Sequence, residues 1–179
     1  LISSYPESSY VQAALQNLVN VSLRLVETHE EHLSEGLQHQ LVLDIRRALD
    51  SSHPLEHNIK ESYKLHLAHA LYNTKKYDDV IEVLSSFVQD FPASPSLSQA
   101  HYLLTLCYHT LHDNEFTFIH GERTLALNGA IEEKAALHRI LFSSSLALAQ
   151  RNVEEETQTM YFDKAAYYLY LIFDDGSHS

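Results

Sequence analysis

The stretch KLHLAHALYNTKKYDDVIEVLSSFVQDFP, residues 64–92, decides the fold. Its first part, extended back to Tyr63, has an apolar stripe at helical spacing that includes Leu67 and Leu71. A polar run at residues 73–76 interrupts this stripe, and a second apolar stripe follows and ends at Pro92. The stretch therefore predicts two amphipathic helices joined by a short turn, and each helix must bury one face against a neighbour.

Helical spacing recurs on both sides of this stretch. Apolar stripes run through residues 11–25 and 97–111, and no segment alternates with a period of two for long enough to predict a strand. Ser52 or His53 before Pro54, and Ser94 before Pro95, are expected helix caps, and Asn128-Gly129 is an expected helix stop. We expect an all-α chain with helices at residues 8–28, 33–50, 55–73, 77–90, 96–111, 114–127, 130–151 and 157–173.

The composition argues against several classes of function. The chain has 12 basic and 24 acidic residues and a formal charge of −12, so it repels phosphate; nucleic acid and anionic membranes are poor partners, and basic peptides or protein faces are better ones. It has only four glycines and none of the glycine-rich motifs that bind nucleotides. No apolar stretch approaches the roughly 20 residues of a spanning helix. The single cysteine, Cys107, is expected to be a small buried thiol rather than a nucleophile.

Comparing the chain with itself reveals repetition. Tyr5-Pro6-Glu7-Ser8 and Phe91-Pro92-Ala93-Ser94 share an aromatic-Pro-x-Ser opening, and each is followed at matching positions by an alanine and a leucine. Fixed-period similarity of this kind is typical of helical repeat arrays, in which each unit buries its apolar face against the next one.

The segment from Lys64 to Pro92 resembles a tetratricopeptide repeat. Lys64 takes the bulky first-helix position, Ala68 the small-residue position, and Pro92 the closing proline, although the family's usual glycine is absent. The next segment resembles a second repeat, with Leu104 lying 37 residues after Leu67. The aromatic-Pro-x-Ser openings resemble repeats of bacterial envelope proteins, which include outer-membrane assembly lipoproteins.

The resemblance implies a right-handed α-solenoid of about four antiparallel helix pairs. We expect residues 1–179 to form a single repeat domain that is a fragment of a longer array, because residues 1–6 resemble the end of a second helix. The resemblance also implies that the first helix of each pair lines a concave face that binds a peptide or protein partner. Carried over by position, the partner-binding residues are Gln16, Asn20, Arg24, Leu65, His69, Tyr72, Asn73, Gln99, Tyr102, Leu106 and His109.

Thirteen histidines are the compositional oddity. The helical pairs His29/His32, His66/His69 and His109/His112 place two imidazoles on one helix face, but a zinc site needs three or four ligands. We expect most of them to be solvated or groove-lining, with titration near pH 6. The acidic runs 30–31 and 154–156 are either solvated or docking sites for basic partners.

These observations favour a non-catalytic protein–protein interaction scaffold, with no catalytic residues, no cofactor and no membrane insertion. One alternative is a structural or self-assembly module that uses the apolar helix at residues 157–173, which we expect to be buried on more than one side and which would support a homo-oligomer. The other is a metal-binding or metal-dependent protein that uses the histidine pairs. The bacterial periplasm and the cytoplasm are both compatible with the sequence.

Overall fold

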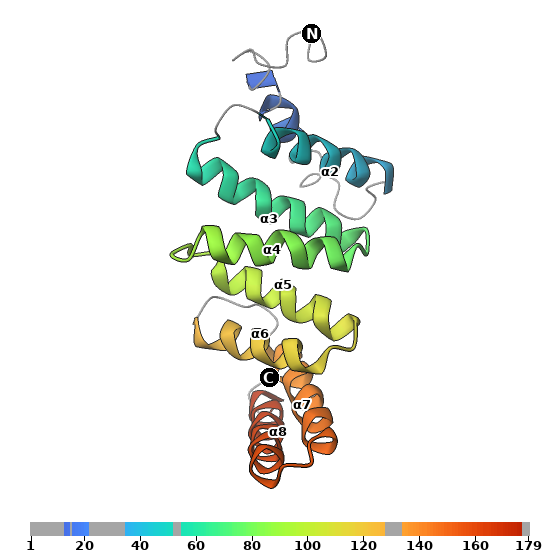
Figure 1. Cartoon of the computed structure of the whole chain (residues 1–179), viewed down its shortest axis with the longest axis vertical. Helices are drawn as coiled ribbons and strands as arrows, with labels where there is room; N and C mark the ends of the chain where they lie inside the picture. Colours follow the sequence, from blue (N-terminus) through green and yellow to red (C-terminus); the bar gives the residue numbers. More distant parts are fainter. Residues whose placement is uncertain (1–12, 15, 22–34, 52–54, 128–133, 177–179) are drawn as a thin grey trace. The chain divides into compact units, whose positions relative to one another are not determined.

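Every regular element in the described part of the chain is a helix. The computed structural model describes residues 13–14, 16–21, 35–51, 55–127 and 134–176 (Figure 1). The helices are α2 (Glu35–Leu49), α3 (His57–Asn73), α4 (Tyr77–Asp90), α5 (Leu97–Thr110), α6 (Asn114–Ala126), α7 (Lys134–Arg151) and α8 (Glu155–Gly176); residues 13–14 and 16–21 are also helical. The all-α prediction is confirmed, and each described boundary lies within about four residues of the expected one.

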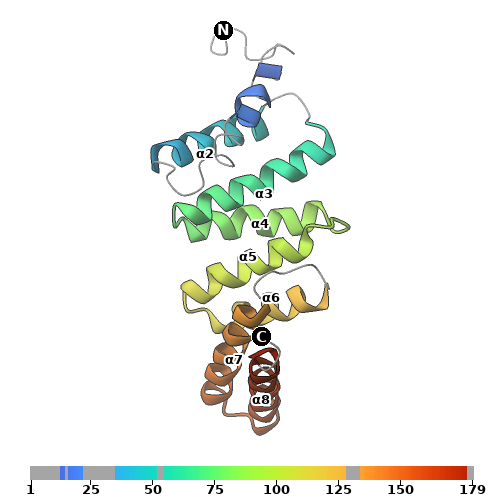
Figure 2. The ribbon, with the colours of Figure 1, turned by 180° about the vertical axis from the view of Figure 1, so that it is seen from behind.

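Consecutive helices form three antiparallel hairpins: α3–α4, α5–α6 and α7–α8 (Figures 1 and 2). Each hairpin is closed by a connection at residues 74–76, 111–113 or 152–154. Such short connections force neighbouring helices to run antiparallel, so the predicted helix pairs are confirmed for these three hairpins.

The first two connections share one hydrogen-bond pattern. The Lys76 amide donates to the Leu71 carbonyl at 2.9 Å, and the equivalent bond 37 residues later has the same length. Before each of these donors lies a residue in the left-handed region, Lys75 or His112, with φ of 60°. This is the Schellman motif, which satisfies carbonyls at a helix end. The offset of 37 residues between Leu67 and Leu104 therefore extends through the turns.

The offset of 37 residues also relates the second helices of these two hairpins, α4 and α6. Val80, Leu84 and Phe87 are buried in α4, and their counterparts in α6 are Thr117, Gly121 and Thr124. The smaller side chains of α6 allow α7 to approach closely. A Cβ atom on Gly121 would lie 2.6 Å from Cδ2 of the fully buried Leu141.

The chain divides into two compact units, Leu1–Asp90 and Phe91–Ser179. In the first unit, α2, α3 and α4 bury Ile45, Leu71, Leu84 and Phe87, and an Arg46–Asp79 ion pair of 2.8 Å joins α2 to α4. In the second unit, Leu137 and Leu141 of α7 form a core with Tyr168 of α8. A single repeat domain over residues 1–179 stays a prediction.

Two local predictions are wrong. Ser94 does not cap α5, because that helix begins at Leu97 with Ser96 in the capping position; the Ser94 hydroxyl instead accepts from the Ser96 amide at 3.0 Å. Helix α8 is not buried on more than one side, because its buried residues, Ala165 and Tyr168, lie on one face. The expected cap at Ser52 or His53 and the stop at Asn128-Gly129 lie outside the described residues.

Candidate functional site

Four predicted partner-binding residues share one side of α3. Leu65, His69, Tyr72 and Asn73, which we call the α3 face, are spaced so that their side chains project from neighbouring positions on the helix surface. The first three are half-buried and Asn73 is exposed. The ring of Tyr72 meets Tyr77 edge-to-face, with centroids 5.6 Å apart, which orients it at the end of the helix.

Four more predicted residues share one side of α5. Gln99, Tyr102, Leu106 and His109 form the α5 face, in which Gln99 and His109 are exposed and the other two are half-buried. Tyr102 also packs against the core of Leu137, Leu141 and Tyr168. This residue therefore supports the packing of α7 and α8, whatever else it contacts. Three positions of the two faces match in the 37-residue register: 65 with 102, 69 with 106, and 72 with 109.

Both faces are uncharged near neutral pH. Burial lowers the pKa of His69, and the neighbouring His66 lowers it further. Burial and then His112 lower the pKa of His109 in the same way. Both shifts favour the neutral imidazole over the protonated form. These uncharged faces differ from the chain as a whole, which has a formal charge of −12.

The remaining predicted residues lie near the N-terminus. Gln16 is half-buried and Asn20 is exposed within the helical residues 16–21, and Arg24 lies outside the described residues. The structure thus groups four residues on α3 and, separately, four on α5. Their role in binding stays a prediction.

Sequence reasoning missed the polar contacts that hold α8 against α6. Glu122 of α6 accepts hydrogen bonds from Lys164 Nζ, 3.0 Å from each carboxylate oxygen, and from the Tyr168 hydroxyl. Burial, followed by the bond to Glu122, raises the pKa of Tyr168, so the phenol stays a proton donor. These partners are 42 and 46 residues apart, and no local spacing pattern predicts contacts at that distance.

A pair of histidines, also missed, lies between α5 and α6. The Nδ1 atoms of His101 and His120 are 2.9 Å apart, so one ring must donate and the other accept. Burial lowers the pKa of His120 to about 4, with His101 adding to the effect. The 37-residue register places His101 at the position that corresponds to Lys64. The Lys64 amine donates hydrogen bonds from α3 to α4, to Ser86 and, at 2.7 Å, to Asp90. The register therefore indicates that a polar side chain at this position contacts the second helix of its hairpin.

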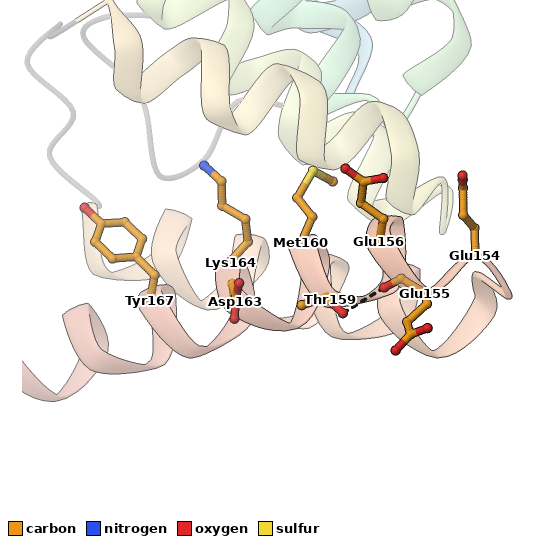
Figure 3. A pocket seen from close by; sticks show the side chains of 8 residues that line it. All are labelled: Glu154, Glu155, Glu156, Thr159, Met160, Asp163, Lys164 and Tyr167. Carbon is orange, nitrogen blue, oxygen red and sulfur yellow. Dashed lines mark hydrogen bonds between the residues drawn. The ribbon is translucent and has the colours of Figure 1, made fainter.

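A pocket lies along the N-terminal half of α8, in the second unit. It has a volume of about 1010 Å³ and is lined by four carboxylates (Glu154, Glu155, Glu156 and Asp163) and by Met160 and Tyr167. We call it the α8 pocket. In Figure 3 the side chains of Glu156, Met160 and Lys164 point from α8 toward the neighbouring helix, and Glu155 points away. Lys164 marks that helix as α6, because it binds Glu122.

Three structural findings bear on the metal, thiol and membrane expectations. Among the described residues, no three His, Cys, Asp or Glu side chains come close enough to share a metal ion. The thiol of Cys107 is fully buried, and burial raises its pKa to about 12, so the expectation of a small buried thiol is confirmed. Within the described part of the chain, none of the helices has both the length and the apolar character needed to cross a membrane.

Comparison with known proteins identifies a family. No curated protein matches the chain at a significant level. The family model YfiO, described as outer membrane lipoprotein, matches residues 31–141, which is more than half of the chain and includes both α3 and α5. This match confirms the resemblance to repeats of envelope lipoproteins. The chain is a member of the YfiO family of outer membrane lipoproteins.

Proposed function

We propose that the chain is a non-catalytic scaffold of the bacterial cell envelope that binds a peptide or protein partner through the α3 face and the α5 face. The observation that carries the proposal is the matched register of the two faces, in which equivalent positions of successive hairpins present uncharged polar and aromatic side chains. Membership of an outer membrane lipoprotein family supports the envelope as the location and helical repeats as the means of binding.

The chemistry of these faces suits an extended segment of a partner protein. The side chains of Asn73 and Gln99 can each donate and accept hydrogen bonds with a peptide backbone. Tyr72, next to Asn73 on α3, offers a ring edge and a hydroxyl group. Because the helices are already ordered, binding a flexible segment orders only the partner, which limits the entropic penalty.

The chemically versatile groups elsewhere have structural roles, which supports a role without catalysis. The Cys107 thiol is buried and protonated, and His101 and His120 hydrogen-bond to each other. Glu122 is engaged by Lys164 and Tyr168. None of these arrangements leaves a base beside an accessible nucleophile.

The proposal is tested by blocking the two faces with bulk. Asn73→Trp and His109→Trp change exposed residues, so folding should persist, whereas Tyr102→Ala would also disturb the core of the second unit. Control variants Gln89→Trp and Glu115→Trp place the same bulk on exposed positions of the second helices α4 and α6. Each tagged protein is incubated with an envelope extract of the source bacterium, and retained proteins are quantified by mass spectrometry.

The expected result is a partner that the wild type and the controls retain equally and that the two face variants lose. Circular dichroism and thermal melting establish that all variants are folded. Equal retention by all the proteins would contradict the proposal, because the partner would then bind elsewhere on the chain.

A further inference from the structure

Helix α8 leaves an apolar surface uncovered in the second unit. Met160 is 45% exposed, Tyr167 is 54% exposed and Phe173 is 71% exposed, although α8 packs along α7 on its other side. A contiguous group of exposed apolar side chains marks an interaction surface, whereas single exposed ones are ordinary. Met160 and Tyr167 lie on one side of α8 and meet this condition, and Phe173 lies on a different side. This surface shares no residue with the α3 face or the α5 face.

The α8 pocket adds shape to this surface. Met160 and Tyr167 lie seven residues apart, two helical turns, on the side of α8 that lines the pocket, so they can contact a partner element running along the helix. Methionine is flexible and polarisable, and it is common in grooves that accept amphipathic helices.

The charge of the pocket selects the partner. Glu154, Glu155, Glu156 and Asp163 line it, and none of the four forms a salt bridge with a described residue. The one cation in the lining, Lys164, is 3.0 Å from Glu122 of α6 and is neutralised by it. The pocket therefore presents four negative charges around an apolar strip.

Two other occupants fit less well. A second copy of the chain would bring another formal charge of −12 against these carboxylates, and like charges at an interface are unfavourable. An anionic membrane surface would be repelled for the same reason. A cationic partner that also has an apolar face satisfies both parts of the pocket.

We propose that the α8 pocket is a docking site for a basic amphipathic helix of another protein. The apolar side of that helix packs on Met160 and Tyr167, and its lysine or arginine side chains pair with the carboxylates. The proposal goes beyond partner binding by α3 and α5, since it assigns a second surface with a different, charge-based selectivity.

The test uses a defined probe and matched variants of the chain. The probe is a fluorescent amphipathic helical peptide of leucine and lysine, and a peptide with glutamate in place of lysine serves as its counterpart. The variant E155Q/E156Q/D163N removes three charges from the pocket, and the control D50N/E82Q/E115Q removes three charges from exposed positions elsewhere. A second variant, M160Q/Y167Q, removes the apolar contacts, and L111Q/I119Q is its control at exposed apolar positions of the same unit.

The expected result in fluorescence anisotropy is that the wild type binds the lysine peptide and not the glutamate peptide. Both pocket variants should weaken binding by about tenfold or more, while both controls stay within about twofold of the wild type. Equal weakening by D50N/E82Q/E115Q would overturn the proposal, since net charge alone would explain binding. Two other results would also overturn the proposal. One is a dimer in analytical ultracentrifugation that M160Q/Y167Q converts to a monomer, and the other is binding of the chain to anionic vesicles and not to the lysine peptide.

Discussion

Single residues in the left-handed region close the first two hairpins. Lys75 and His112 adopt φ of 60°, a conformation that is unfavourable for residues with a Cβ atom, where many helix ends use glycine. Lys75→Gly and His112→Gly should each raise the free energy of unfolding by about 1 kcal/mol, measured by urea denaturation.

The neighbouring Lys76→Gly is the control for this prediction. Lys76 is outside the left-handed region, so glycine there should only increase the freedom of the unfolded chain and lower stability. If Lys75→Gly destabilised the protein as much as Lys76→Gly, the description of this turn would be wrong.

The His101–His120 pair makes stability depend on pH. The pKa of His120 is about 4 in the folded protein and about 6.5 when unfolded. Between these values the unfolded chain binds a proton that the folded chain rejects. The free energy of unfolding should therefore be flat above pH 6.5 and fall by up to about 3 kcal/mol toward pH 4. Urea titrations at several pH values measure this dependence.

His120→Phe is the matched variant for the histidine pair. It keeps an aromatic ring beside Tyr108, whose centroid lies 5.4 Å from that of His120, but it cannot bind a proton. The loss of stability on acidification should shrink, whereas His39→Gln, at an exposed position of α2, should leave it unchanged. An unaltered pH profile in His120→Phe would refute the assignment.

At the scale of elements, Gly121 sets how closely α6 and α7 approach. Alanine in place of a helical glycine normally stabilises a protein by roughly 0.5–1 kcal/mol. Here its Cβ would lie 2.6 Å from Leu141, which is fully buried and cannot move aside freely. Gly121→Ala should therefore lower the free energy of unfolding by about 1–3 kcal/mol in urea denaturation.

Two comparisons check this close approach. Gly36→Ala, at an exposed position in α2, should be neutral or stabilising. In the double variant Gly121→Ala/Leu141→Ala, the loss should be smaller than the sum of the two single losses, because removing the leucine relieves the clash. Simple additivity would show that the two residues are not in contact.

The helix pairs could be predicted from sequence because their signals are local. Apolar spacing, the polar turn at residues 73–76 and the offset of 37 residues all act over a few helical turns. The contacts of Glu122 with Lys164 and Tyr168 could not be predicted, since they join residues more than 40 positions apart. The exposure of α8 could not be predicted either, because apolar composition does not reveal how many sides of a helix find neighbours.

At the scale of the whole molecule, Cys107 reports on the integrity of the second unit. Its thiol is fully buried in α5, and burial raises its pKa to about 12. A thiol reagent should label it about a hundredfold more slowly in the native protein than in urea. The variant Cys107→Ser/Ser143→Cys, with its thiol at an exposed position of α7, should react at once. Rapid labelling of native Cys107 would contradict the packing of α5.

The chain belongs to the YfiO family, and its described helices carry faces that differ in charge. The α3 and α5 faces are uncharged, whereas the α8 pocket is acidic, so the two proposed surfaces call for partners of different chemistry. Because the proposed surfaces share no residue, each can be blocked by substitution without changing the other.

The most direct measurement of the central claim is site-specific photo-crosslinking in living cells. A photoreactive amino acid is placed at Asn73, Gln99 or His109 on the proposed faces and, as controls, at Gln89 or Glu115 on the second helices. The proposal predicts that all three face positions crosslink to one and the same partner protein and that the control positions do not. Crosslinks to that partner from α4 and α6 alone, or none from α3 and α5, would contradict it.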